Sequence, residues 1–270
     1  MSIITSTPID SMEGAYDVSG KNVIVTGGAH GLGWGISLAF AQAGANVAIF
    51  CRNVERGAES LKKLQETTPG THACIACDVS SHDSVIEAKQ QYFETYDHVD
   101  VLVNNAGVDT SAPFLSEKGL EEWYRVIGTD LHGVAHMVYE FAPSMVERGQ
   151  GGTIINISST GAVRTPVSDT QHLAPYNVAK AGVDIFSRYL AVALSKDNIR
   201  ALSIQPGPIH SDLDAHLPQS AIDAFEQDMP AHRFGEPIEL GAFCVYLSSP
   251  AASFIRGANI PFDGGLLCIM

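Results

Sequence analysis

Three residues near the middle of the chain have types and spacing that could move a proton: Ser159, Tyr176 and Lys180. Tyr176 and Lys180 are four positions apart, a spacing that places both side chains on one face of a helix. An ammonium beside a phenol favours the ionised phenol, so such a tyrosine can exchange a proton near neutral pH. The Ser159 hydroxyl can hydrogen-bond the oxygen that gains or loses this proton. Because Tyr-x-x-x-Lys is also found in helices where the pair only faces solvent, this interpretation requires a nucleotide site elsewhere in the chain.

The elements around these residues favour a ligand site. The apolar, β-branched run Thr153–Ile157 predicts a buried strand that ends at Ser158 and Ser159. A helix is predicted to begin near Ala174 and to carry Tyr176 and Lys180. Open α/β sheets bind ligands beyond the carboxyl ends of their strands. The predicted strand therefore delivers its serines to a binding edge.

A glycine-rich turn near the N-terminus predicts the nucleotide site. The sequence T-G-G-A-H-G-L-G (26–33) follows a strand-like run, Lys21–Thr26, and precedes a helical pattern that ends at Gly44. Glycines let the backbone approach a pyrophosphate, and the helix N-terminus supplies free N–H groups and a favourable dipole. An ordinary strand-to-helix turn is the alternative. The residues expected at the cofactor here are Gly27, His30, Gly31, Leu32 and Gly33.

The end of the second predicted strand, Asn46–Phe50, is the place where a dinucleotide's ribose is read. A carboxylate there would bind the ribose hydroxyls of NAD, but this chain continues with Cys51, Arg52 and Asn53. Nothing repels a 2′-phosphate, Arg52 can pair with it, and His30 could assist. We therefore favour NADP(H), with NAD(H) possible. In the alternative interpretation Arg52 only covers a sheet edge.

Bulk composition limits the remaining classes of function. A chain of 270 residues with 45% hydrophobic composition suits one α/β domain. A formal net charge of −14 without a basic cluster disfavours nucleic acid and anionic membranes as partners. Five scattered cysteines suit a reducing cytoplasm. Cys74 and Cys77 form a C-x-x-C pair, but residues three apart on a strand point to opposite faces, so no metal site is expected.

Strand-like and helical segments alternate along the whole chain, which predicts an α/β, doubly wound, parallel Rossmann-type sheet of about seven strands. Residues 1–19 read as a polar arm without the basic and apolar regions of a signal peptide. Residues 20–270 read as the dinucleotide-binding catalytic domain. An amphipathic insertion at about 210–232 is predicted to be a substrate lid. The other expected strands are Ala73–Cys77, Val99–Val103, Ile199–Ile204 and Ala258–Phe262, and a long helical stretch is expected from Ser116 through Tyr139.

In this order the motifs resemble those of the short-chain dehydrogenase/reductase family, over roughly Gly20–Leu266. The resemblance implies that Tyr176 is the general acid in carbonyl reduction and the general base in alcohol oxidation. It implies that Lys180 also binds the nicotinamide ribose and that Ser159 orients the substrate oxygen. The motifs T-G-G-A-H-G-L-G, D-V, N-N-A-G, I-S-S, Y-N-V-A-K and P-G-P-I-H-S carry the likeness. Further implied cofactor contacts are Asp78, Val79, Asn105, Ala106, Gly107, Pro206, Gly207, Ile209 and Ser211.

Two features depart from the family's pattern. Where relatives usually have an asparagine thought to hold a water near the lysine, this chain has Asp130, in D-L-H-G-V. An ionised Asp130 would add a charge near Lys180 and change the balance that tunes Tyr176. The second departure is the sixteen residues between Ser159 and Tyr176, more than is usual. The stretch Arg164–His172 either shapes a wall of the substrate site or decorates the surface.

Two functions of different classes follow. The first is an NADP(H)-preferring oxidoreductase that interconverts a secondary alcohol and a ketone, with a sugar or polyol, a hydroxysteroid or a similar carbonyl compound as substrate. The second is a cofactor-binding sensor or scaffold whose turnover is weakened by Asp130. Relatives commonly form homotetramers or homodimers through their long helices, and the apolar tail 266–270 is expected at a subunit contact.

Overall fold

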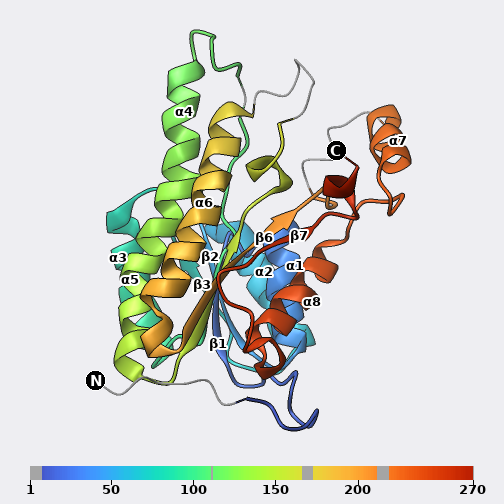
Figure 1. Cartoon of the computed structure of the whole chain (residues 1–270). Helices are drawn as coiled ribbons and strands as arrows, with labels where there is room; N and C mark the ends of the chain where they lie inside the picture. The colour runs from blue at the N-terminus through green and yellow to red at the C-terminus, as the bar shows by residue number, and fades with distance from the viewer. Residues whose placement is uncertain (1–7, 111, 166–172, 212–218, 270) are drawn as a thin grey trace.

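The protein folds around a seven-stranded parallel sheet, seen edge-on between two layers of helices in Figure 1. The computed structural model describes residues 8–110, 112–165, 173–211 and 219–269. The strand order is β3-β2-β1-β4-β5-β6-β7, and every neighbouring pair is parallel. The strands are β1 Asn22–Thr26, β2 Asn46–Cys51, β3 Ala73–Ala76, β4 Val101–Asn104, β5 Gly152–Ile157, β6 Ile199–Pro206 and β7 Asn259–Phe262. The predicted doubly wound fold is confirmed.

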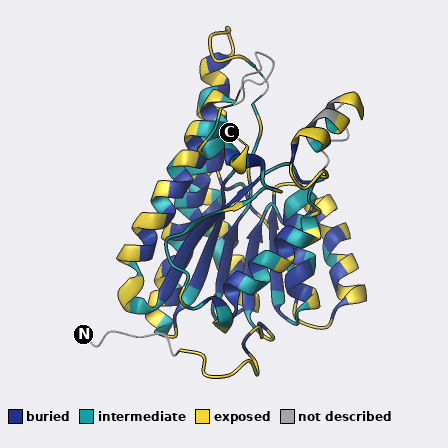
Figure 2. Cartoon of the chain, turned by 45° about the vertical axis from the view of Figure 1, so that its right-hand side comes forward, coloured by how far each residue is buried: buried dark blue, intermediate teal, exposed yellow. Residues whose placement is uncertain are grey.

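The five central strands are almost entirely buried because helices cover both faces of the sheet, as the dark blue strands of Figure 2 show, whereas the edge strands β3 and β7 are only partly buried. On one face the core is closed by α3 (His82–Thr95), α5 (Gly133–Arg148) and α6 (Ala174–Ala193). On the other face it is closed by α1 (Gly31–Gln42), α2 (Val54–Thr67) and α8 (Pro237–Ser248). Among the described residues the other helices are α4 (Gly119–Ile127) and α7 (Gln219–Asp228), with short segments η1 Gly128–His132, η2 Thr160–Ala162, η3 Ser195–Asp197, η5 Pro250–Ala252 and η6 Leu266–Cys268.

Local side-chain chemistry explains several element boundaries. Ser81 caps α3, because its hydroxyl accepts a hydrogen bond from the Ser84 N–H at 3.3 Å. The prediction that β4 ends at Val103 was wrong by one residue. Asn104 continues the strand because its buried amide donates to Asn156 of β5 at 2.8 Å. The prediction that a helix opens at Ser116 was also wrong. Ser116 belongs to the preceding turn, its hydroxyl donating to the Pro113 carbonyl at 2.7 Å.

The strand order reverses at β1 and β4, which makes their carboxyl ends the topological switch point of the sheet. Ligands of open α/β sheets bind in the crevice outside this point. The glycine turn follows β1, the N-N-A-G segment follows β4, and Ser159 follows β5. The fold therefore brings three motifs that are distant in sequence to neighbouring strand ends.

The N-terminal segment that is described, residues 8–19, packs onto the domain. Ala15 and Val18 are buried, and the Ala15 carbonyl accepts a hydrogen bond from the Ala251 N–H at 2.8 Å. The Tyr16 ring lies 6.2 Å from the Tyr246 ring, centre to centre. Hence this part of the polar arm is packed against the domain. None of the helices in the described residues combines the length and the hydropathy of a transmembrane segment.

Candidate active site

Helix α6 carries the two residues of the Tyr-x-x-x-Lys motif. Lys180 is buried and Tyr176 is partly exposed, and the Lys180 ammonium lies 5.4 Å from the centre of the Tyr176 ring. The ammonium donates to the Ile157 carbonyl at the end of β5, at 3.1 Å. The Ser158 hydroxyl donates to the Lys180 carbonyl, also at 3.1 Å. Strand β5 and helix α6 are therefore joined at the position where the serines and the Tyr/Lys pair meet.

Ser159 is placed to act as a hydrogen-bond donor. It lies directly after β5, and its Oγ accepts a hydrogen bond from the Gly161 N–H at 3.0 Å. Because this contact uses a lone pair, the hydroxyl proton is left for another acceptor. Segment η2, which Ser159 caps, packs against α6. The three residues predicted to do the chemistry thus belong to one continuous region of the molecule.

Lys180 forms a buried ion pair with Asp130, the residue that replaces the family's asparagine. Asp130 Oδ2 lies 3.1 Å from Lys180 Nζ, and the Asp130 side chain is fully buried. Its Oδ1 accepts a hydrogen bond from the Val108 N–H at 2.8 Å. A side chain at Gly107 would come within 2.8 Å of Oδ2, so glycine at this position leaves space for the pair. The direct contact favours the interpretation in which Asp130 adds charge at Lys180.

The charge of Lys180 survives burial because carboxylates surround it. Burial alone lowers the pKa of an ammonium. Asp130, followed by Tyr176 and Asp184, more than offsets this effect, and the pKa of Lys180 is raised above its usual value. Lys180 is therefore an ammonium throughout the physiological pH range.

The glycine turn has the backbone shape that a pyrophosphate requires. Gly27 and Gly31 have positive φ angles, 64° and 51°, which favour glycine. A side chain at Gly33 would lie 2.1 Å from the Gly27 carbonyl oxygen, so only glycine lets α1 approach the end of β1. Helix α1 starts at Gly31, and the side chain of its N-cap residue, His30, makes no capping hydrogen bond. These features fit a dinucleotide phosphate group, which the N-terminal amides of α1 would bind.

The N-N-A-G segment is tied to the end of β1. Thr26 Oγ1 accepts hydrogen bonds from the N–H groups of Asn105 and Ala106, at 2.9 and 3.0 Å. The Asn105 amide donates to the Thr26 carbonyl at 2.9 Å. Residues 104–107 are therefore held beside the glycine turn, where Asn105, Ala106 and Gly107 are expected to contact the cofactor.

The residues predicted at the adenosine end of the cofactor lie after β2 and β3. Arg52 is exposed at the end of β2. Asn53 caps α2, its side chain accepting from the Arg56 N–H at 2.9 Å, so its amide already has a structural partner. Asp78 accepts from the Ser80 hydroxyl at 2.7 Å, and the Val79 carbonyl contacts an imidazole nitrogen of His136 at 2.9 Å.

The loop after β6 lies against both the last strand and the glycine turn. The Gly207 N–H donates to the Phe262 carbonyl at 3.0 Å, and a side chain at Gly207 would come within 2.8 Å of Asp263. Ile209 is buried and pairs with Gly235. A Cβ added to Gly31 would lie 3.7 Å from the Ser211 Cβ. Pro206–Ser211 therefore reach back to the turn expected to bind phosphate.

Sequence reasoning missed a buried carboxylate below the Tyr/Lys pair. Asp184 follows Lys180 by one helical turn and is itself buried. It accepts hydrogen bonds from the Ser203 hydroxyl at 2.7 Å and from the Gln205 amide at 2.6 Å. Because Gln205 directly precedes Pro206, Asp184 fixes α6 relative to the loop after β6. The i, i+4, i+8 spacing of Tyr176, Lys180 and Asp184 was the signal available in the sequence.

Two predicted features lie partly outside the described residues. The structure does not describe residues 166–172 of the extended segment after Ser159, nor residues 212–218 of the proposed lid. The described part of the lid includes α7, which lies at the upper end of the molecule in Figure 1, near the C-terminus. Met229, at the end of this insertion, is buried against Phe234 and Leu266.

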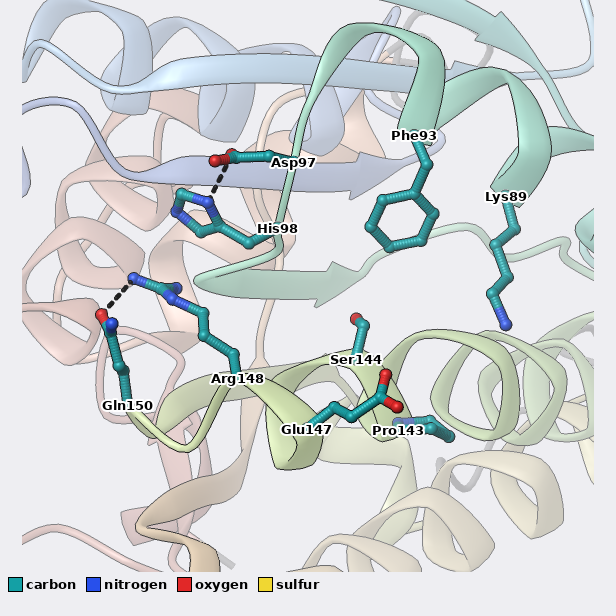
Figure 3. A pocket seen from close by; sticks show the side chains of 9 residues that line it. All are labelled: Lys89, Phe93, Asp97, His98, Pro143, Ser144, Glu147, Arg148 and Gln150. Atoms are coloured by element: carbon teal, nitrogen blue, oxygen red, sulfur yellow. Dashed lines mark hydrogen bonds and ion pairs between the residues drawn. The ribbon is translucent and has the colours of Figure 1, made fainter.

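A concave surface region between α3 and α5 lies away from this site, and Figure 3 shows its side chains. Asp97 and His98 precede β4, and Gln150 precedes β5, which places the region at the amino ends of the strands. Arg148 there pairs with Asp100. The region therefore belongs to the opposite end of the sheet from Tyr176 and Lys180. Among the described residues, no group of three or more His, Cys, Asp or Glu side chains is arranged to hold a metal ion.

Comparison with known proteins identifies relatives over nearly the whole chain. A family model described as enoyl-(acyl carrier protein) reductase matches residues 27–267. A 3-oxoacyl-[acyl-carrier-protein] reductase of Chlamydia trachomatis is 35% identical over 246 residues, which is 91% of this chain and 97% of that protein. A D-threitol dehydrogenase of Mycolicibacterium smegmatis is 34% identical over 258 residues, 94% of this chain and 96% of that protein.

A solved structure gives the same fold. L-Sorbose reductase of Gluconobacter frateurii, in complex with NADPH and L-sorbose, superposes with a TM-score of 0.86 at 29% identity. The match covers 94% of this chain and 98% of that one. The relatives share oxidoreductase chemistry on alcohols and ketones, although their named substrates differ. This chain belongs to the short-chain dehydrogenase/reductase family and is an NAD(P)-dependent oxidoreductase.

Proposed function

We propose that the protein is an NADP(H)-preferring oxidoreductase that interconverts a secondary alcohol and a ketone, with Tyr176 as general acid and base. The position of Lys180 carries this proposal. Its ammonium is held by the Ile157 carbonyl and by Asp130, each at 3.1 Å, beneath the Tyr176 ring. A buried cation fixed beside a partly exposed phenol favours the phenolate form that proton transfer passes through.

Each residue has a defined task in ketone reduction. Ser159 donates its hydroxyl proton to the carbonyl oxygen of the substrate and so orients it. When bound, the nicotinamide supplies the hydride in reduction and accepts it in oxidation. Tyr176 gives its phenolic proton to the same substrate oxygen, and Lys180 stabilises the phenolate that remains. In alcohol oxidation the tyrosinate removes the hydroxyl proton, so the same residues serve both directions.

The preference for NADP(H) rests on the end of β2. Cys51, Arg52 and Asn53 supply no carboxylate there, and Arg52 is exposed where the adenosine ribose would lie. A guanidinium binds a phosphate through charge-assisted, bidentate hydrogen bonds. Arg52 would therefore bind the 2′-phosphate of NADP(H) more strongly than the 2′-hydroxyl of NAD(H).

Titration of NADPH and NADH into wild type and Arg52→Asp, followed by cofactor fluorescence, tests this preference. We expect NADPH to bind wild type at least about tenfold more tightly than NADH, which is the effect of one good charged contact. Arg52→Asp should reverse the order. Lys62→Asp, which makes the same charge change on the exposed face of α2, is the matched control and should retain wild-type selectivity. Equal or tighter NADH binding by wild type would show that another residue reads the ribose.

For the substrate we propose a small polyhydroxy ketone or its alcohol as the first class to assay. Two of the relatives described above are named for substrates of this kind, D-threitol and L-sorbose. Hydroxysteroids and similar carbonyl compounds form the comparison panel. Faster reduction of ketosteroids than of ketoses by the same preparation would reassign the substrate class.

We further infer that the protein works as a homotetramer or homodimer in a reducing compartment such as the cytoplasm. Helix α6 exposes an apolar stripe at Val178, Ile185, Tyr189 and Val192, the last with 77% of its surface accessible. These positions recur at helical spacing, and apolar stripes of this kind commonly mark subunit contacts. In the C-terminal tail, Leu266 is buried within its own chain and Ile269 is 52% exposed. A tail contact between subunits would therefore involve Ile269.

A further inference from the structure

Two cysteines from neighbouring strands meet beneath helix α2. The sulfur atoms of Cys51, at the end of β2, and Cys74, in β3, are 3.6 Å apart. In the parallel register Cys74 pairs with Ile49, two residues before Cys51, so both thiols lie on the same face of the sheet. Cys77, the other half of the C-x-x-C motif, packs into the core on the opposite face, as predicted. The cysteines that meet are therefore a pair that the motif did not suggest.

The space around the two sulfurs is shaped by a glycine. A Cβ added to Gly57 of α2 would lie 2.5 Å from the Cys51 sulfur and 2.4 Å from the Cys74 sulfur. Any side chain at this position would push the helix away from both thiols. Gly57 thus lets the first turns of α2 cover the thiol pair closely.

The hydrogen bonds give the two thiols different roles. The Cys51 sulfur lies 3.3 Å from the Asn53 carbonyl, which can only accept, so the Cys51 S–H donates there. Cys74 then donates its own proton to the Cys51 sulfur. This hydrogen bond from Cys74 lowers the pKa of Cys51 although Cys51 is buried, and it raises the pKa of Cys74. Cys51 also lies near the N-terminus of α2, where the helix dipole favours a thiolate.

We propose that Cys51 and Cys74 form a thiol oxidation site for hydroperoxides, in which Cys51 reacts first and Cys74 resolves the product. The Cys51 thiolate attacks the terminal peroxide oxygen, the O–O bond breaks, and the alkoxide or hydroxide that leaves takes up a proton. Cys51 becomes a sulfenic acid. The Cys74 sulfur attacks the sulfenic sulfur, an S–S bond forms, and water leaves with the Cys74 proton. The two thiols lose two electrons and the peroxide gains them.

The sulfurs are already in contact, and Cys74 is partly exposed, so a small peroxide reaches the pair from the Cys74 side. A disulfide requires sulfurs about 2.05 Å apart, closer than in the reduced protein. Closing this gap moves the end of β2 against β3 and α2. Arg52 follows Cys51 directly, so the disulfide displaces the proposed contact to the 2′-phosphate. This consequence for cofactor affinity rests on the proposed function, whereas the oxidation site itself does not.

Peptide mapping tests the site directly. Full-length protein in the Cys268→Ser background, which removes an exposed thiol, is treated with hydrogen peroxide, alkylated and digested without reduction. We expect a peptide pair linked through Cys51 and Cys74, with Cys77 and Cys244 alkylated only after denaturation. In the Cys74→Ser variant, dimedone should trap a sulfenic acid at Cys51. Recovery of Cys51 and Cys74 as free thiols after peroxide treatment, or a link to Cys77 instead, would overturn the proposal.

Cofactor titration measures the consequence. NADPH should bind the oxidised protein at least tenfold more weakly than the reduced protein, dithiothreitol should restore binding, and Cys74→Ser should show no reversible loss. Unchanged NADPH affinity in a protein shown by mapping to be linked would refute the coupling to Arg52. If the reduced protein itself failed to bind NADPH or NADH, the proposed function would fail while the mapped disulfide would still support the oxidation site.

Discussion

Lys180 keeps a positive charge inside the protein because a second buried charge lies beside it. The fully buried Asp130 carboxylate lies 3.1 Å from the ammonium and is held by the Val108 N–H. In the family's usual arrangement an uncharged amide takes this position. The exchange places a full negative charge next to the cation expected to stabilise the Tyr176 phenolate. The Asp130 carboxylate therefore offsets part of the electrostatic stabilisation that Lys180 gives to the Tyr176 phenolate.

Replacing Asp130 with asparagine removes the negative charge that offsets the effect of Lys180 on Tyr176. In Asp130→Asn, Asp184 still offsets part of the burial of Lys180. If Lys180 stays charged, it acts on the phenol without the opposing carboxylate, and the rising limb of the pH–rate profile for alcohol oxidation should move to lower pH. The measurement is kcat/KM against pH for wild type and variant. Asp97→Asn, which removes an exposed carboxylate at the other end of the sheet, should leave the profile unchanged. An unchanged or oppositely shifted profile in Asp130→Asn would contradict this account of Asp130.

The Tyr/Lys pair and the glycine turn could be predicted from sequence because each is defined by spacing within one element. The contact between Asp130 and Lys180 could not, since it joins residues fifty positions apart on different helices. The aspartate was visible as a departure, but whether it held a water or met the lysine depended on packing. Asp184 was missed for the same reason, because its partners Ser203 and Gln205 come from β6.

At the scale of elements, a short π-helical segment, Gly128–His132, joins α4 to α5 and carries Asp130. Such segments insert an extra residue into a helix and are frequent at functional sites. The sequence predicted one long helix here but not this change of winding. Strand ends were also predicted only to within a few residues. Local polar contacts, such as that between Asn104 and Asn156, decide where a ladder stops.

The edge strand β3 depends on a buried neutral histidine. His72 Nδ1 accepts a hydrogen bond from the Val47 N–H of β2 at 3.2 Å, and Nε2 lies 3.1 Å from the Thr68 hydroxyl. The Thr68 hydroxyl itself donates to Leu64, so Nε2 must carry the proton. Burial lowers the pKa of His72, and hydrogen bonds with the backbone of Thr68 and Pro69 partly oppose this effect. Protonation of Nδ1 would place its N–H against the Val47 N–H, two donors with no acceptor between them.

This arrangement predicts a pH-dependent stability. The usual pKa of histidine is about 6.5. Below this pH the unfolded chain binds a proton at His72 that the folded protein resists, so the free energy of unfolding decreases as the pH is lowered. His72→Asn keeps an acceptor for Val47 and loses the contact to Thr68. It should cost about 1 kcal/mol at pH 7.5 and flatten the loss between pH 7 and 5.5. Urea unfolding at several pH values measures this.

The exposed His232 provides the control for that series. It has a positive φ of 52°, a conformation that asparagine tolerates, so His232→Asn should leave stability and its pH dependence unchanged. Equal acid sensitivity of wild type and His72→Asn would show that other groups govern stability in this range.

At the scale of the whole molecule, the exposed apolar stripe on α6 predicts self-association. Ile185, Tyr189 and Val192 have 63%, 65% and 77% of their surfaces accessible in the single chain. The double substitution Tyr189→Glu and Val192→Arg should lower the molar mass measured by light scattering to that of a smaller assembly. The folded chain should survive, because both side chains already face outward. Unchanged molar mass would exclude this stripe from the contact.

A control substitution of similar charge belongs on a surface away from this stripe. Glu59→Lys and Lys63→Glu on α2 change two charges without touching α6, and the assembly should remain intact. The sequence alone could not predict which helix faces are left uncovered. Both α1 and α6 are apolar helices, yet α8 packs on α1 while the outer face of α6 has no cover within the described chain.

The role of Tyr176 as general acid is tested most directly by the rate of NADPH oxidation with a ketose panel, compared for wild type and Tyr176→Phe. We predict turnover by wild type, and a loss of at least about a hundredfold in kcat for the variant, the size expected for removing a general acid. NADPH binding should stay within twofold. Tyr189→Phe, which alters an exposed tyrosine of the same helix, should retain activity. Full activity in Tyr176→Phe would show that Tyr176 is not the general acid. NADPH binding by wild type with no turnover of any ketone would favour a cofactor-binding protein without catalysis.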